Sequence, residues 1–129
     1  MAITPEVQQA VAELQETWPD CPITTREDGE GGAFVIMEQI ALFPPYIQAT
    51  TWAGFRLVFQ YPYADVYPHF IRGDLSRTDG RALGEAMTQT TFEGRPAIQI
   101  SRRTTNYHAD LQTAAIKLHK VLEWLRTRP

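Results

Sequence analysis

A chain of 129 residues is the size of a single domain, long enough to bury about two-thirds of its unfolded surface. A net charge of −3 argues against nucleic-acid binding, which normally needs a basic face, and no apolar run approaches the roughly 20 residues that span a bilayer. One cysteine cannot make an internal disulfide, and no Cys/His spacing indicates a metal site. Since the first residues also lack a secretion signal, we expect one cytoplasmic domain over residues 1–129, without metal or cofactor.

The chain is predicted to begin with a helix over residues 4–18. Thr4 is a good N-cap, because its hydroxyl can accept a hydrogen bond from a backbone N–H of the first turn, and Pro5 suits the first helical position. Apolar side chains then recur at spacings of four, three and four, which places them on one buried face: Val7, Val11, Leu14 and Trp18. Pro19 is expected to end this helix.

Four segments in the middle of the chain have the composition of strands. The first is a short edge strand over residues 21–26, and an acidic, glycine-rich turn separates it from the second, residues 33–42. The third, residues 52–61, alternates apolar and polar side chains as a strand with one buried face does. The fourth is the short apolar piece 69–71, which follows a proline-rich stretch. Because short links join these segments, neighbouring strands are expected to pair antiparallel.

The rest of the chain is predicted to be a long loop followed by a helix. Residues 73–96 are polar and irregular, which indicates a loop or a loop with a short helix near 81–87, and residues 97–101 form a brief extended segment. A long helix follows over residues 106–127, with apolar residues at four-three-four-three spacing: Leu111, Ala115, Leu118, Leu122 and Leu125. The predicted fold is α+β, a four-stranded antiparallel meander packed by the N-terminal helix and the long C-terminal helix.

The segment FRLVFQYPYADVYPHFI, residues 55–71, combines an alternating aromatic strand, the turn Tyr67-Pro68 and a further short strand. In this order of elements the chain resembles the ubiquitin-conjugating enzymes and their non-catalytic relatives, the RWD and variant domains. The stretch Phe43-Pro44-Pro45-Tyr46 is similar to the proline-rich hairpin often found between the second and third strands of that family. The resemblance covers residues 4–125 and implies a ubiquitin-conjugating-enzyme-like fold.

The resemblance also implies where catalysis would take place. Active members of the family carry a cysteine in the extended segment before the following helices, often after a His-Pro-Asn triplet. The matching stretch here, residues 94–101 (GRPAIQIS), has no cysteine, and a thioester cannot form without a thiolate. Cys21 lies elsewhere, beside Asp20, whose charge would raise the pKa of the thiol. The chain therefore resembles a catalytically inactive, bacterial member that works in a ubiquitin-like pathway.

Tyrosines next to prolines are the candidate partner-binding residues: Tyr46, Tyr63 and Tyr67, together with Pro68. Such rings are usually half buried and can anchor a partner, although they could equally seal the edge of the sheet. The resemblance implies a protein-interaction module whose partner is a ubiquitin-like protein, an activating enzyme or another protein of the same operon. The first helix and the Pro/Tyr loops would contact that partner.

Two other functions stay open at this point. His69 has Asp65 and Asp74 within a few residues, and a carboxylate can orient an imidazole as an acid–base group. The alternative is thus a small enzyme that uses His69 in a cleft under the long loop, although a structural histidine at the start of a strand is the simpler interpretation. The third hypothesis is a homo-oligomer that pairs through an exposed apolar helix face.

Overall fold

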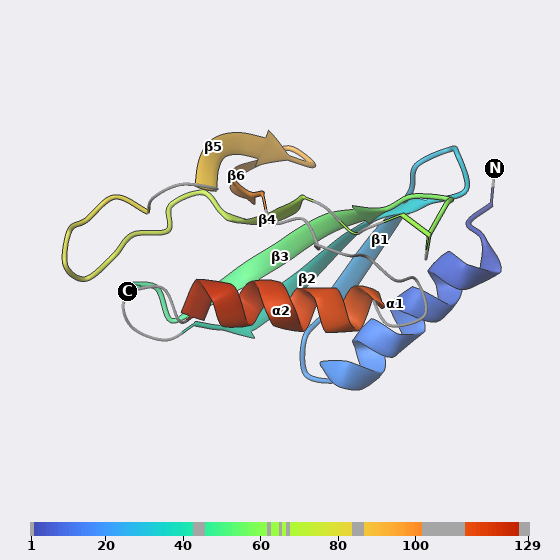
Figure 1. The fold of residues 1–129 in the computed structure, drawn as a ribbon, viewed down its shortest axis with the longest axis horizontal. Coiled ribbons are helices and arrows are strands. Elements are labelled where there is room, and N and C mark those ends of the chain that lie inside the picture. The colour runs from blue at the N-terminus through green and yellow to red at the C-terminus, as the bar shows by residue number, and fades with distance from the viewer. Residues whose placement is uncertain are drawn as a thin grey trace.

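The computed structural model describes residues 2–42, 46–61, 63–64, 66, 68–83, 87–101 and 113–126. In this part of the chain, two helices cover one face of an antiparallel sheet (Figure 1). The elements in chain order are α1 (Pro5–Thr17), β1 (Ile23–Glu27), β2 (Ala33–Ala41), β3 (Thr50–Leu57), β4 (His69–Arg72), β5 (Met87–Phe92), β6 (Arg95–Ile100) and α2 (Ala114–Arg126). Neither of the described helices combines the length and apolar character needed to cross a membrane.

The sheet has six strands in the order β1-β2-β3-β4-β6-β5. The predicted α+β class, the antiparallel pairing and the two terminal helices are confirmed, but the predicted number of four strands is wrong. Strand β5 lies inside the stretch predicted to be a loop, and its sequence, MTQTTF, is polar and mostly exposed, so it lacks the apolar alternation of a strand. Glu93 and Gly94 form the two-residue turn into β6, with φ angles of 50° and 78°, as hairpin turns require.

At the start of each helix a backbone N–H donates a hydrogen bond to a side-chain oxygen. The Thr4 hydroxyl accepts from the Val7 N–H at 3.2 Å, which confirms the predicted N-cap of α1. The Tyr61 hydroxyl accepts from the Ala114 N–H at 2.9 Å, so the turn after β3 is tied to the start of α2. Residues 106–112 and 127 of the predicted final helix and residues 84–86 of the short helix expected near 81–87 lie outside the described residues. Residues 81–83 are not helical, Met87 belongs to β5, and α2 begins at Ala114.

The main core lies between the sheet and the helices. Strand register places Val35, Phe55 and Leu57 on the face that the helices cover, together with Ile71 and Ile98 of the later strands. Leucines of α2 pack onto them and are fully buried: Leu118, Leu122 and Leu125. Burying each such side chain contributes about 1.5–3 kcal/mol. The apolar face of α2 is therefore used inside the chain, so it does not offer the exposed helix face of the oligomer hypothesis.

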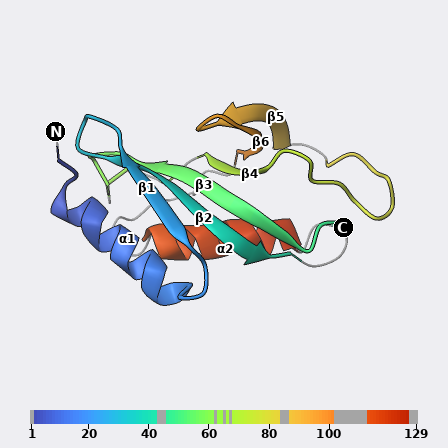
Figure 2. The same cartoon turned by 180° about the vertical axis from the view of Figure 1, so that it is seen from behind.

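The sheet curls so that its last hairpin lies over the face away from the helices, which we call the open face (Figures 1 and 2). Arg26 of β1 and Glu93 of the β5–β6 turn come from opposite ends of the strand order, yet their side chains pair at 2.7 Å. Arg95 of β6 reaches across in the same way to Glu38 of β2, at 2.8 Å. Two bridges therefore hold the hairpin against the first two strands.

A glycine at the centre of the open face makes room for the hairpin. The Phe92 ring lies directly on Gly54 of β3, where a Cβ atom would stand 2.6 Å from Cε2 of Phe92. The same ring stacks on Phe70 at a centroid distance of 4.4 Å and lies 6.2 Å from Trp52 and 6.1 Å from Phe34. Any side chain at position 54 would push Phe92, and with it the hairpin, away from β3.

We expect Gly54→Ala to destabilise the fold by about 1–3 kcal/mol, because overpacking against an aromatic ring outweighs the entropic gain of replacing a glycine. Chemical denaturation measures this difference. In the Phe92→Ala background the ring is gone, so the same substitution should become neutral or stabilise by about 0.4–1 kcal/mol. An equal loss of unfolding free energy in the wild-type and Phe92→Ala backgrounds would contradict the contact between Gly54 and the Phe92 ring.

Candidate functional site

The open face carries an aromatic cluster crossed by arginines. The cluster consists of Phe34, Trp52, Phe70 and Phe92. The guanidinium groups of Arg26 and Arg56 lie 4.5 and 5.3 Å from the centre of the Phe34 ring, and that of Arg95 lies 5.3 Å from Trp52. Each arginine also pairs with a carboxylate, so the positive charges are balanced within the chain. Aromatic stacking and cation–π contacts here hold the sheet and the hairpin together.

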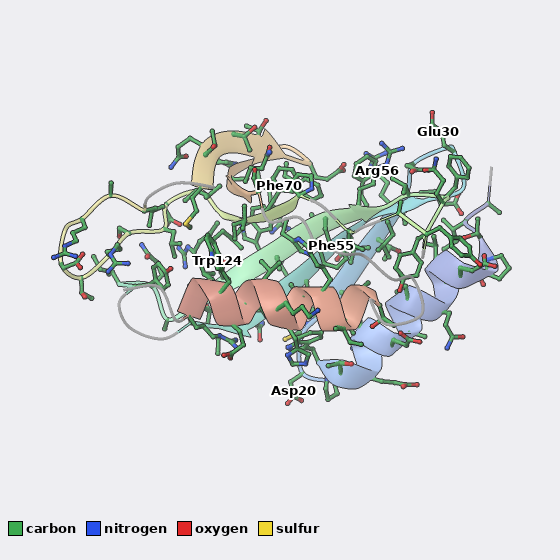
Figure 3. The ribbon with its side chains drawn as sticks, in the orientation of Figure 1. Asp20, Glu30, Phe55, Arg56, Phe70 and Trp124 are labelled. Carbon is green, nitrogen blue, oxygen red and sulfur yellow. The ribbon has the colours of Figure 1, made fainter. Side chains whose placement is uncertain are left out.

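The β1–β2 turn is organised by Asp28, whose carboxylate is almost fully buried. It accepts hydrogen bonds from the N–H groups of Glu30 and Gly32 at 2.8 and 2.9 Å, and from Arg56 at 2.9 Å. Burial alone would raise the pKa of Asp28, but these hydrogen bonds outweigh it and hold the pKa below its ordinary value. Arg56 and Glu30 meet at this end of the sheet (Figure 3).

An open cleft of about 650 Å³ lies beside the hairpin, at the end of the sheet where β2 ends and β3 begins. Its lining residues are Pro22, Glu38, Gln39, Thr50, Thr51, Trp52, Arg72, Gly73, Asp74, Arg95 and Pro96. Both of its arginines are occupied: Arg72 pairs with Asp74, and Arg95 with Glu38. The hydrogen bond from Arg72 lowers the pKa of Asp74, so this carboxylate stays ionised. Among its described lining residues there is no cysteine, histidine or serine, and the hydroxyl of Thr51 is already hydrogen-bonded to the Trp52 carbonyl and the Arg72 N–H.

His69 lies in the core rather than in this cleft. Its side chain is 1% exposed, and its ring centre is 5.2 Å from that of Phe55, on the helix-covered side of the sheet. Asp74 is exposed, and its carboxylate is held by Arg72, whose position in β4 places it on the open face. Asp65 lies outside the described residues. The structure therefore does not bring His69 and Asp74 together, and the acid–base pair expected from their nearness in sequence is not formed.

The candidate tyrosines have opposite environments. Tyr46 is only 4% exposed, and its hydroxyl donates a hydrogen bond to the Leu125 carbonyl at 2.7 Å. Its assignment as a partner-binding residue is therefore wrong, because the ring fastens α2 to the sheet from within. Tyr63, in contrast, is 81% exposed. Pro68 is half-buried, and Tyr67 lies outside the described residues.

Phe59 is a surface residue that the sequence analysis missed. The alternation of residues 52–61 predicts that Phe59 is buried like Phe55 and Leu57, but β3 ends at Leu57 and Phe59 is 53% exposed. Two consecutive turns follow the strand, with hydrogen bonds from the Tyr61 N–H to the Val58 carbonyl and from the Tyr63 N–H to the Gln60 carbonyl. The signal for this change was the density of turn residues around Pro62, which marks the end of a strand.

Cys21 lies between α1 and β1 and is buried. Its thiol donates a weak hydrogen bond to the Gln39 carbonyl at 3.7 Å. Burial raises the pKa of the thiol, and the charge of Asp20 raises it further, so thiolate formation is disfavoured. The segment matched to the catalytic stretch of the resembled family is strand β6, whose Ile98 and Ile100 are core residues.

The described residues contain no group of three or more His, Cys, Asp and Glu side chains that could hold a metal ion. Comparison of the chain with protein-family models, with curated proteins and with solved structures finds no match.

In the native protein we expect the Cys21 thiol to react with a thiol reagent at least about tenfold more slowly than in the denatured chain, because it is buried and protonated. A Cys21→Ser/Ile47→Cys double variant provides the matched control, since Ile47 is 63% exposed. Stopped-flow or absorbance measurements give both rates. If native Cys21 reacted as fast as the thiol of that control, the assignment of a buried, inert cysteine would be wrong.

Proposed function

We propose that this chain is a non-catalytic, ubiquitin-conjugating-enzyme-like protein-interaction module whose partner is anchored by Phe59 and Tyr63. The observation that carries the proposal is the exposure of these two rings on the two consecutive turns after β3. The aromatic residues of the open face, in contrast, pack on one another. Large exposed aromatic side chains are typical anchors of interfaces, because each buries much apolar area while few rotatable bonds are fixed.

The turn that carries Phe59 and Tyr63 is held in place before any partner binds. Tyr61 lies between them in the chain, is buried, and accepts a hydrogen bond from the first N–H group of α2. Two backbone hydrogen bonds fix the turn itself. Such preorganisation lowers the entropy lost on binding, so more of the energy of burying the two rings is available for affinity. Burying one large apolar side chain contributes about 1.5–3 kcal/mol.

The number and the burial of the cysteines support the proposed absence of conjugating activity. A thioester requires an accessible thiolate, and the one cysteine of the chain is buried with a raised pKa. The segment that would carry the nucleophile in the resembled family is here strand β6 and contains no cysteine.

The type of partner follows from the resemblance. The chain runs from an N-terminal helix through the meander β1–β4 and the β5–β6 hairpin to a C-terminal helix; the two helices and the meander support the resemblance, whereas the hairpin is an addition to it. On this basis the proposed partner is a ubiquitin-like protein or an activating enzyme of a bacterial pathway. No contact among the described residues favours the alternative of an enzyme built on His69, since Asp74 is bound to Arg72.

The test uses tagged chain expressed in its native host, followed by direct binding of the purified partner. The Phe59→Ser/Tyr63→Ser variant should weaken binding at least about tenfold, which corresponds to 1.4 kcal/mol. Ile47→Ser is the matched control, because Ile47 is similarly exposed but lies in the connection at the other end of β3. Mass spectrometry identifies the partner, and isothermal titration calorimetry measures the affinity.

Equal affinity of the Phe59→Ser/Tyr63→Ser variant and the wild type would contradict the assigned surface. A partner that is neither a ubiquitin-like protein nor an adenylating enzyme would overturn the proposed pathway. It would not contradict the assignment of Phe59 and Tyr63 as the binding surface. A thioester formed on Cys21 with an activated ubiquitin-like protein would overturn the proposal that the module is non-catalytic.

A further inference from the structure

Strand β5 is an edge strand without the usual protection against pairing. It is last in the strand order and, among the described strands, pairs only with β6. Its six residues, MTQTTF, include no charge and no proline, and the four central ones are exposed. Natural edge strands usually carry lysines, prolines or inward-pointing charges that prevent a further strand from adding. The opposite edge, β1, does carry charges, at Arg26 and Glu27.

The hairpin register shows which backbone groups of β5 point outward. Phe92 and Arg95 close a two-residue turn, so they form a hydrogen-bonded pair, and such pairs then alternate along the hairpin. Thr90 and Thr88 accordingly bond to β6. The N–H and C=O groups of Met87, Gln89 and Thr91 point away from it. The pairing of Thr91 with Pro96 agrees with this register, because proline has no N–H to offer at that position.

We infer that β5 pairs antiparallel with β5 of a second copy of this chain, so that one sheet continues through a two-fold symmetric dimer. A strand that pairs with its own copy must be self-complementary, and uncharged threonines meet this condition without repulsion between like charges. The symmetric registers that pair at least two of the outward residues centre on Thr88, Gln89 or Thr90. Across the interface Thr88 faces its own copy in the first register, Thr90 faces Thr88 in the second, and Thr90 faces its own copy in the third.

This surface is distinct from the one proposed for the protein partner. Phe59 and Tyr63 lie on the turn after β3, whereas β5 is the strand at one edge of the sheet. The dimer would therefore leave the aromatic anchors exposed and present them twice. The proposed dimer is independent of the proposed function, since it depends only on the exposed edge strand β5.

Sedimentation equilibrium over a concentration series tests the dimer. The wild type should show a monomer–dimer equilibrium, and Thr88→Lys/Thr90→Lys should raise the dimer Kd at least about tenfold, because lysines face each other in each of the three registers. The Thr88→Glu/Thr90→Glu variant should do the same. An equimolar mixture of the two variants should restore a dimer, which a misfolded variant would not do, and circular dichroism checks that each variant is folded.

Thr91→Pro provides a second, independent variant. It removes an outward N–H but no hydrogen bond to β6, so it should weaken the dimer while the hairpin persists. A wild type that stays monomeric throughout the series would overturn the inference, as would charged variants that dimerise like the wild type. Failure of the Lys and Glu variants to form a mixed dimer would also overturn it.

Discussion

The contact between the Phe92 ring and Gly54 is the constraint on which the architecture of the sheet depends. Without a Cβ atom at position 54, the β5–β6 hairpin can lie on β3, and the open face becomes a second small core of aromatic rings. The bridges Arg26–Glu93 and Arg95–Glu38 form around this contact. Partly exposed ion pairs contribute at most about 1 kcal/mol each, so the aromatic packing is the larger influence on where the hairpin lies.

This arrangement leaves few surfaces for function. The helices cover one face of the sheet, the hairpin covers much of the other, and the cleft beside the hairpin is lined by arginines that already have carboxylate partners. Among the described residues, two features that this internal packing does not use are the exposed aromatic side chains on the turns after β3 and the uncharged edge of β5. The proposed function, binding of proteins, rests on these two features.

The parts of the fold that depend on local chemistry could be predicted from the sequence. The cap at Thr4, the stop before Pro19 and the leucine spacing of the last helix involve neighbours in the chain, and α1 and the described part of α2 agree with them. Strand β5 escaped prediction because an exposed edge strand needs no apolar residues. Its position depends on pairing with β6 and on Phe92, and neither is a property of the segment itself.

In the candidate site, too, tertiary contacts decide what the local sequence could not predict. Tyr46 and Tyr63 both adjoin prolines, but the first is bonded to α2 and the second is exposed, a difference decided by tertiary contacts far away in sequence. His69 and Asp74 are close in the chain, but the strand sends their side chains to different environments. The absence of a cysteine from residues 94–101, in contrast, is read directly from the sequence and does not depend on the fold.

The central claim is that the β5–β6 hairpin rests on β3 through Phe92. The proposed binding surfaces are then the turns after β3 and the exposed edge of β5. A nuclear Overhauser experiment on the wild-type protein tests it most directly. The account predicts strong cross-peaks between the Phe92 ring protons and the α protons of Gly54, with those α protons shifted by the ring current. Absence of these cross-peaks, with Gly54 at ordinary chemical shifts, would show that the open face is uncovered and would contradict the account.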